Sequence, residues 1–375
     1  MMPVVRELNR LNYTFDHTLV TTAQHREMLD QVFEVFGVKP DIDLALMQNN
    51  QSLGDFASRA LGALFELFGT LKPDAVLIQG DTTTVTIGAL AAFYSGVIVG
   101  HVEAGLRSFD TQNPFPEEMN RRIASCISDL HFAPTEQSRL NLLREGVPQQ
   151  NVFVTGNTIV DALRSIQLGI SFNNERLKQI DFDGKRVLLV TAHRRENHGL
   201  RLRLICCALR SIVSSFDDVE IVYPVHLNPN VSRVVHEELD GVPAIHLVDP
   251  LSYTDLLRVM KRCYFVLTDS GGIQEEAPSF NKPVLILRET TERPEIIEVG
   301  AGKIVGADAD QIVRAAELIL TEPRVYAAMS AAENPFGDGR AAERIAALLE
   351  ERLAGSFKLQ PQRADGLLEQ VAAGD

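Results

Sequence analysis

The sequence predicts an α/β protein with two domains, each built on a parallel sheet. Short runs that are apolar on both faces alternate along the chain with longer stretches of helical periodicity. This alternation is typical of parallel sheets covered by helices on both sides. The length of 375 residues also favours two domains. We therefore expect two Rossmann-like domains whose sheets face a common cleft.

Strands and helices can be assigned in order along the chain. The expected strands of the first half are HTLVTT, AVLIQG, VIVGHVE, HFAPT and VFVTG, and those of the second half are RVLLVTAH, VEIVYPVH, AIHLVDP, FVLTDS, PVLILR and KIVG. The clearest helical stretches are PVVRELNRL, SRALGALFELFGTL and LRLICCALRSIVSSF. The chain thus starts with a helix, whereas doubly wound domains usually start with a strand and a Gly-rich turn.

A polar, poorly periodic stretch divides the two series and predicts the domain boundary. The expected organisation is a first α/β domain at 1–168, a linker at 169–185, a second α/β domain at 186–337, a closing helix at 338–355 that crosses back to the first domain, and a loosely held tail at 356–375.

Composition excludes several classes of function. The net charge is −14, which argues against broad nucleic-acid binding because that needs a basic face. No apolar run approaches the roughly 18 residues of a membrane span, and no signal peptide is visible, so we expect a cytoplasmic protein. None of the four cysteines forms a CxxC pair or has zinc-ligand spacing, so free thiols and no metal site are expected.

Two acids of the first half follow consecutive strands. Asp81 follows AVLIQG, and Glu103 ends VIVGHVE. Consecutive strands are often neighbours, so both carboxylates could reach one cleft. Two structural alternatives remain open: Asp81 as a helix N-cap, and Glu103 as the ion-pair partner of Arg107.

A third acid lies beyond a proline-bounded turn. Glu117 and Glu118 follow NPFP and begin a helical stretch, where acids are common because of the helix dipole. Arg121 and Arg122 on that stretch could hold a phosphate or pair with the acids.

The second half carries a different set of residues. The strand RVLLVTAH leads into His193 and Arg194, a sequence that suits a diphosphate. In VLTDSGGIQEEAP a strand leads into Ser270, Gly271 and Gly272 at the start of a helix, where free N–H groups can meet an anion.

Further second-half residues extend this phosphate site. Glu276 lies one helical turn beyond the glycines, where its carboxylate could accept hydrogen bonds from ribose hydroxyls. Arg293 follows the next strand. His226 in YPVHLNPNV is a weaker candidate. The pattern is neither GxGxxG nor a P-loop, so no nicotinamide cofactor or ATP is favoured. A nucleotide-diphosphate sugar fits, with its diphosphate on the second domain and its sugar at the acids of the first.

With these residues assembled, the sequence closely resembles the non-hydrolysing UDP-N-acetylglucosamine 2-epimerases. The resemblance runs from residue 1 to about 350 and rests on TAQHREMLD, GDTTT, GHVEAGLR, PFPEEMNR, TGNT, HRRE, YPVHLNPNV, TDSGGIQEEAP and TTERPE, in that order. It implies a fold like that of the GT-B glycosyltransferases, a homodimer, and reversible conversion of UDP-GlcNAc to UDP-ManNAc for cell-surface polysaccharide synthesis.

The resemblance also implies roles at matching positions. The acid/base candidates are Asp81, Glu103 and Glu117, with Arg121 and His193 as substrate contacts. His193 would also help to stabilise the departing diphosphate. The UDP site would comprise Ser270, Gly271, Gly272, Glu276 and Arg293. Candidates for an activating second UDP-GlcNAc site are Gln24, His25, Arg194 and His226.

The chain departs from the family at its start. The family opens with a strand and a GTRPEAIK-like loop that contacts substrate, whereas this chain begins at MMPVVREL. We therefore expect a gap in the first sheet and an upstream start site, with Met1 an internal methionine.

Three rival functions remain for the sequence. They are a GT-B-type glycosyltransferase, a hydrolysing 2-epimerase, and a catalytically silent UDP-sugar binding protein.

Overall fold

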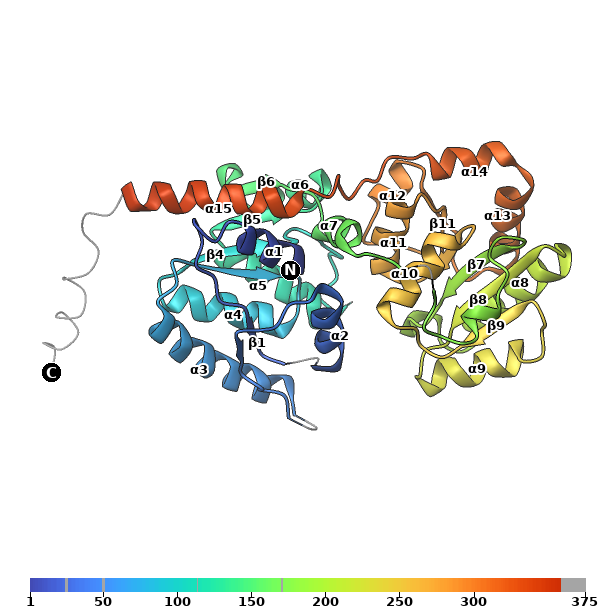
Figure 1. Ribbon diagram of the computed structural model, residues 1–375, viewed down its shortest axis with the longest axis horizontal. Helices are drawn as coiled ribbons and strands as arrows, with labels where there is room; N and C mark the ends of the chain where they lie inside the picture. Colours follow the sequence, from blue (N-terminus) through green and yellow to red (C-terminus); the bar gives the residue numbers. More distant parts are fainter. Residues whose placement is uncertain (24–25, 49–50, 113, 170, 359–375) are drawn as a thin grey trace, which may run out of the picture.

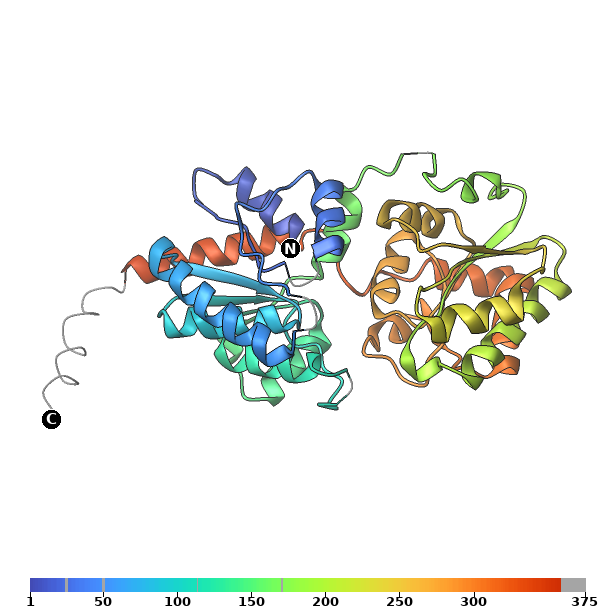
Figure 2. The same ribbon diagram turned by 90° about the horizontal axis from the view of Figure 1, so that it is seen from below.

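The computed structural model describes residues 1–23, 26–48, 51–112, 114–169 and 171–358. Its residues form two lobes, each with its own parallel sheet (Figure 1). Two stretches of chain join the lobes, one after helix α7 (Thr158–Ser165) and one before helix α15 (Ala341–Lys358) (Figures 1 and 2). The predicted fold class is confirmed. None of the described helices is long and apolar enough to cross a membrane.

The first lobe contains a four-stranded sheet with the order β3-β4-β5-β6. Its elements are α1 (Met2–Arg10), β1 (Val20–Thr21), α2 (Arg26–Phe36), β2 (Ile42–Asp43), α3 (Leu53–Leu71), β3 (Ala75–Gln79), α4 (Thr83–Tyr94), β4 (Ile98–Val102), α5 (Glu117–Ile127), β5 (Leu130–Ala133), α6 (Glu136–Arg144), η1 (Gln149–Asn151), β6 (Val152–Val154) and α7 (Thr158–Ser165).

The second lobe contains a six-stranded parallel sheet with the order β12-β11-β10-β7-β8-β9. Its elements, after η2 (Leu177–Gln179), are β7 (Arg186–Thr191), η3 (Arg195–Asn197), α8 (Leu200–Ser215), β8 (Val219–Pro224), α9 (Pro229–Leu239), β9 (Ile245–Val248), α10 (Tyr253–Arg262), β10 (Val266–Thr268), α11 (Gly271–Glu276), η4 (Ala277–Phe280), β11 (Val284–Ile286), α12 (Glu295–Glu298), β12 (Gly302–Ile304), α13 (Ala309–Thr321) and α14 (Pro323–Ser330).

Strand β7 shows why these strands are apolar throughout. Leu188 and Val190 pack into one hydrophobic cluster, while Val187 and Leu189 pack into another. Successive side chains of a strand point to opposite faces, so both faces of the sheet are covered. Burial on both faces is the physical reason for the continuous apolar runs in the sequence.

The last helix, α15 (Ala341–Lys358), returns to the first lobe. There Ile345, Ala346 and Leu349 join Val4 and Leu8 of α1 in one buried cluster. The backbone N–H groups of residues 341 and 342 donate to the carboxylate of Asp161 at 3.1 and 2.8 Å, which fixes the start of the helix.

Strands β1 and β2 form a separate two-stranded parallel sheet. Val20 pairs with Ile42 and Thr21 with Asp43. We did not predict β2, because DIDLAL is short and mixes acids with apolar residues. In the described residues, neither strand pairs with the four-stranded sheet.

The strand order places the predicted site residues. Strands β3 and β4 are direct neighbours, so the loops that carry Asp81 and Glu103 leave the same edge of the first sheet. In the second sheet β10 lies between β7 and β11, which gathers the loops after these three strands. Ligands of open α/β sheets bind outside the carboxyl ends of the strands.

Candidate active site

Asp81 is held by an arginine and does not cap a helix. Helix α4 begins at Thr83 with Thr82 in the N-cap position, so the N-cap alternative for Asp81 is wrong. The Asp81 carboxylate instead accepts from Arg121 Nη2 at 2.7 Å. Asn120 donates to the Asp81 backbone carbonyl at 2.8 Å. Two residues of helix α5 therefore hold both the backbone and the carboxylate of Asp81, just after the end of β3.

Glu103 has a strained backbone, with φ at +66°. Side chains other than glycine rarely adopt this region, and such strain is concentrated at functional sites. The alternative pairing with Arg107 is wrong, because Arg107 binds Glu145 at 2.6 Å and Ser125 at 2.9 Å. The Glu103 side chain instead accepts a long hydrogen bond from Gln79 at 3.4 Å.

The chain turns sharply after Glu103, and the turn requires glycine at position 105. Its φ is +91°, and an added Cβ would lie only 2.2 Å from the carbonyl oxygen of Ser138 on α6. Only glycine fits this close backbone approach. The sequence after β4 is therefore specialised to turn sharply and leave the Glu103 carboxyl at the sheet edge.

The environment of Glu103 favours its protonated form. Burial, the negative charge of Glu275 and that of Asp81 together raise the pKa of Glu103 to about 7, against an opposing effect of Arg293. A carboxyl group with a pKa near neutrality can both take up and release a proton at physiological pH. Such a perturbed group in a cleft is a recognised indicator of a functional site.

The two acids that begin α5 have different environments. Glu118 is fully buried and accepts from the backbone N–H groups of Ser108 and Phe109 at 2.9 and 3.2 Å, as well as from Arg121 at 3.2 Å. It is thus a structural anchor as well as the helix-start acid that we expected. Glu117 is half-buried, and its Oε2 is a buried atom without a hydrogen-bond partner among the described residues.

Asp269, immediately after β10, organises the loop that carries His193. One of its carboxylate oxygens accepts from the backbone N–H groups of His193 and Arg194 and from Asn197 Nδ2, each at 2.9 Å. The other lies 3.7 Å from His193 Nδ1. Burial lowers the pKa of His193. Asp269 was not among our predicted site residues, although it ends the quoted strand motif.

The Ser270-Gly271-Gly272 turn begins α11 as predicted, with Ser270 in the N-cap position. The Ser270 hydroxyl makes no capping hydrogen bond within the helix. Arg293 lies directly over this turn, since a Cβ added to Gly271 would be 3.1 Å from the guanidinium carbon. The turn therefore presents a hydroxyl group and a cation together.

Glu275 and Glu276 are adjacent residues of α11, but their side chains bind different partners. Glu275 binds Arg293 Nε at 2.8 Å, whereas Glu276 accepts from the hydroxyl of Tyr253 at 2.9 Å. Burial raises the pKa of Glu276 to about 7. We predicted Glu276 but not Glu275 or Tyr253; the only sequence signal for Glu275 is its place beside Glu276.

A cavity of about 320 Å³ brings the two lobes' residues together. Gln79 and Glu103 line it from the first lobe, and Tyr253, Glu275 and Glu276 line it from the second. Met1, Met2, Pro3, Val32 and Phe36 are among its apolar lining residues. The structure thus brings Glu103 of the first lobe and Glu276 of the second lobe to one cavity between the lobes.

Of the candidates for a second nucleotide-sugar site, the structure places two. The ring of His226 stacks on that of His193, with 5.2 Å between ring centroids and 12° between ring planes. The backbone of Arg194 is fixed by Asp269. Gln24 and His25 lie outside the described residues. Within the described part of the chain, no cluster of His, Cys, Asp or Glu is suited to hold a metal ion.

Comparison with known proteins agrees with this geometry. A family model described as UDP-N-acetylglucosamine 2-epimerase matches residues 6–350. The chain is 48% identical to the UDP-N-acetylglucosamine 2-epimerase of Bacillus subtilis, covering 98% of this chain and 95% of the relative. The Escherichia coli enzyme of the same name is 46% identical, with 92% and 93% covered.

The fold is also shared with solved structures of such enzymes. The crystal structure of UDP-GlcNAc 2-epimerase from Neisseria meningitidis bound to UDP-GlcNAc superimposes with a TM-score of 0.85 at 43% identity, covering 94% of this chain and 96% of that one. The described lobes therefore have the arrangement of GT-B-like nucleotide-sugar enzymes. Sequence and structure together show that this chain belongs to the UDP-N-acetylglucosamine 2-epimerase family.

Proposed function

We propose that this protein catalyses the reversible epimerisation of UDP-GlcNAc to UDP-ManNAc at C2 of the sugar. The observation that carries the proposal is Glu103, a half-buried acid with a strained backbone that lines the same cavity as Glu276 of the second lobe. Family membership supplies the substrate class, because the matching relatives are named for it.

The chemistry requires more than one acid. The C2 hydrogen has no adjacent carbonyl and is very weakly acidic, so direct ionisation is unfavourable. In the proposed reaction a carboxylate removes the C2 proton while the C1–O bond breaks, giving 2-acetamidoglucal and UDP. UDP then adds back at C1 while a proton is delivered to the opposite face of C2.

Three acids of the first lobe support this acid/base requirement. Glu103 has a pKa of about 7, Asp81 is held in place by Arg121, and Glu117 has an unpartnered oxygen. Groups on both sugar faces are needed to invert the centre through a planar intermediate. We assign the set of acid/base residues without assigning each to a face.

The second lobe supplies the groups that would hold the departing diphosphate. Arg293 lies over Gly271, Ser270 precedes it at the N-cap of α11 without a capping hydrogen bond, and His193 lies on the neighbouring loop. Preorganised donors and cations stabilise a charge that develops in the transition state. Glu276 would bind the ribose hydroxyls. We infer no cofactor and no metal requirement.

Proton NMR of this chain with UDP-GlcNAc in deuterated water tests the proposal. Epimerisation predicts UDP-ManNAc together with deuterium at C2 of both nucleotide sugars. The rival functions give different spectra: a glycosyltransferase gives no exchange at C2 without an acceptor, and a hydrolysing epimerase releases free ManNAc and UDP. UDP binding without exchange or new products would favour a silent binding protein and overturn the proposal.

We further propose that the protein is a cytoplasmic homodimer. Three neighbouring helices of the first lobe carry exposed large apolar side chains, namely Phe65 on α3, Phe93 and Tyr94 on α4, and Met119 and Ile123 on α5. Exposed apolar surface of this kind marks association sites. The four cysteines, all free, fit a reducing compartment. Light scattering with Phe93→Asp tests the dimer, which this substitution should weaken.

Arg194 and His226 remain our candidates for an activating second UDP-GlcNAc site. Their support is the stacking of His226 on His193 at the edge of the nucleotide residues. Sigmoidal dependence of the rate on UDP-GlcNAc, lost in His226→Ala, is the expected signature.

A further inference from the structure

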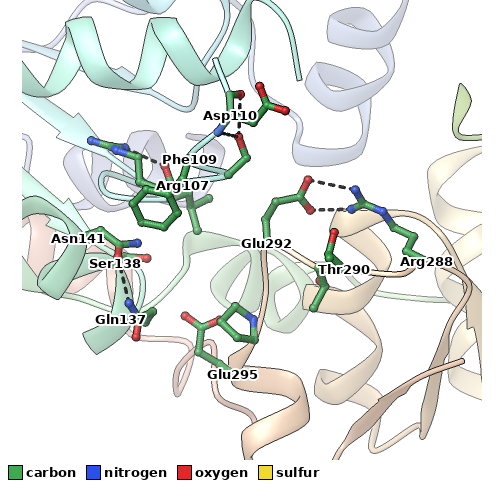
Figure 3. A pocket seen from close by; sticks show the side chains of 14 residues that line it. Arg107, Phe109, Asp110, Gln137, Ser138, Asn141, Arg288, Thr290, Glu292 and Glu295 are labelled. Atoms are coloured by element: carbon green, nitrogen blue, oxygen red, sulfur yellow. Dashed lines mark hydrogen bonds and ion pairs between the residues drawn. The ribbon is translucent and has the colours of Figure 1, made fainter. Parts of the chain in front are cut away.

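A second cavity, of about 400 Å³, lies between the lobes and contains none of the proposed catalytic or nucleotide residues (Figure 3). Its first-lobe wall is the loop after β4 and the start of α6, and its second-lobe wall is the segment before α12. The lining residues include Phe109, Asp110, Arg288, Glu292 and Glu295.

Glu295 is the most informative of these residues. Its side chain is only 8% exposed, and one carboxylate oxygen accepts from the hydroxyl of Thr135 across the lobes at 2.5 Å. The other oxygen, Oε2, is buried without a partner among the described residues. Figure 3 shows the carboxyl group facing across the cavity toward the first-lobe wall. A buried acceptor in this state is unfavourable unless a donor reaches it.

Phe109 supplies an apolar surface on the opposite wall. Its ring is 61% exposed although its backbone is in the left-handed region, with φ at +61°. The buried carboxylate of Glu118 holds this conformation by accepting from the N–H groups of Ser108 and Phe109. A bulky residue at positive φ is a rare conformation that the surrounding structure must enforce. Figure 3 shows the ring on the cavity wall.

The charges of the cavity determine the kind of ligand. Arg288 is engaged by Glu196 at 2.6 Å and by Glu292 at 2.7 Å. Asp110 and Glu295 have no cationic partner among the described residues. The uncompensated charge is therefore negative, which disfavours phosphates and nucleotide sugars.

We propose that this cavity binds a neutral pyranose sugar, separately from the catalytic site. One hydroxyl of the sugar would donate to Glu295 Oε2, and the C–H face of the ring would pack on Phe109, whose aromatic face is electron-rich. Binding sites for small molecules combine aromatic surface with a few placed polar groups in this way. Because its walls come from both lobes, an occupant would contact both.

Isothermal titration and saturation-transfer NMR with the full chain test the proposal. The probes are N-acetylglucosamine and glucose, with N-acetylglucosamine 1-phosphate as the charged comparison. We expect saturable binding of a neutral sugar whose affinity changes less than about twofold when UDP-GlcNAc is saturating, and binding of the phosphate at least about tenfold weaker.

Two substitutions and two matched controls locate the site. Phe109→Ala and Glu295→Gln should each weaken sugar binding about tenfold. Tyr13→Ala removes an exposed ring just beyond the end of α1, and Glu298→Gln removes an exposed charge from the same helix as Glu295; both should leave binding unchanged. Phe109 is a surface side chain, so its variant is expected to fold, and circular dichroism checks all four.

Three results would overturn the proposal: no saturable binding of either sugar up to about 20 mM, loss of binding when UDP-GlcNAc is added, or unchanged binding in both cavity variants. C2 exchange is measured on the same samples. If the proposed epimerisation is wrong, the exchange measurement will show no deuterium at C2. The sugar titration does not depend on that result and still tests the second cavity.

Discussion

Arg293 and Glu275 form a buried ion pair over the first turn of α11, with 2.8 Å between Arg293 Nε and the Glu275 carboxylate. Glu275 also lines the cavity that contains Glu103, and its negative charge contributes to the raised pKa of Glu103. One acid of the second lobe thus holds the guanidinium of Arg293 and raises the pKa of an acid in the first lobe.

Glu275→Gln should lower the pKa of Glu103, because a negative neighbour is removed while Arg293 stays. In the pH profile of kcat/KM, the inflection near neutrality should move to lower pH by about one unit. Glu298→Gln, an exposed change on a neighbouring helix, is the control. An unmoved inflection with correctly folded protein would show that Glu275 does not influence the titrating group.

Removing each proposed acid tests the acid/base set. Asp81→Asn, Glu103→Gln and Glu117→Gln should each reduce turnover at least about 10²-fold, in the range for loss of acid–base catalysis. UDP should still bind, as measured by calorimetry. Asp74→Asn, an exposed acid at the opposite end of β3, should behave like the unsubstituted protein. Near-normal turnover in all three variants would exclude the carboxylate mechanism.

Gly271→Ala tests the place of Arg293. A Cβ at this position would lie 3.1 Å from the guanidinium, so Arg293 must move, and UDP affinity should fall about tenfold. Gly69→Ala on α3 meets no atom within 4 Å and should leave UDP affinity unchanged. Equal UDP affinity in the two variants would contradict the assignment of Arg293 to the nucleotide.

The raised pKa of Glu103 predicts a pH dependence of stability. Its pKa is 4.5 in the reference state and about 7 in the folded protein, so folding favours the protonated form. The associated stability is fully present below about pH 4.5 and is lost as pH rises through about 7, amounting to at most about 3 kcal/mol.

Urea unfolding of ligand-free protein at several pH values between these limits measures this effect. Glu103→Gln cannot ionise there and should show a shallower decline of unfolding free energy with rising pH. Glu66→Gln, on α3, is a remote control. Identical slopes for Glu103→Gln and the unsubstituted chain would mean that Glu103 is ionised in the folded state across this range.

Much of the fold could be predicted from local patterns. Every strand that we expected is present, because strands buried on both faces need continuous apolar runs. The short β2 was missed, since two residues that pair only with β1 carry no periodic signal. The helix starts at Glu117 and Gly271 also follow from their local sequence.

The candidate site was predictable only in part. Asp81, Glu103 and Ser270 follow strands, so their position at a sheet edge is a consequence of sequence order. Whether Glu103 paired with Arg107 was open until the structure showed Arg107 bound to Glu145, 38 residues further along the chain. Asp269 and Glu275 were missed because their partners lie in other segments.

The sequence by itself determined the alternation of strands and helices, the two-domain class and the family, since these depend on local periodicity and ordered motifs. Only the tertiary structure decided which charges meet. It paired Asp81 with Arg121 and Glu275 with Arg293, and among those of residues 1–358 that it describes it gave Glu103 no ion pair. The physical reason is that ion pairing and burial depend on distances between segments far apart in the chain, which strand order and the approach of the two lobes establish.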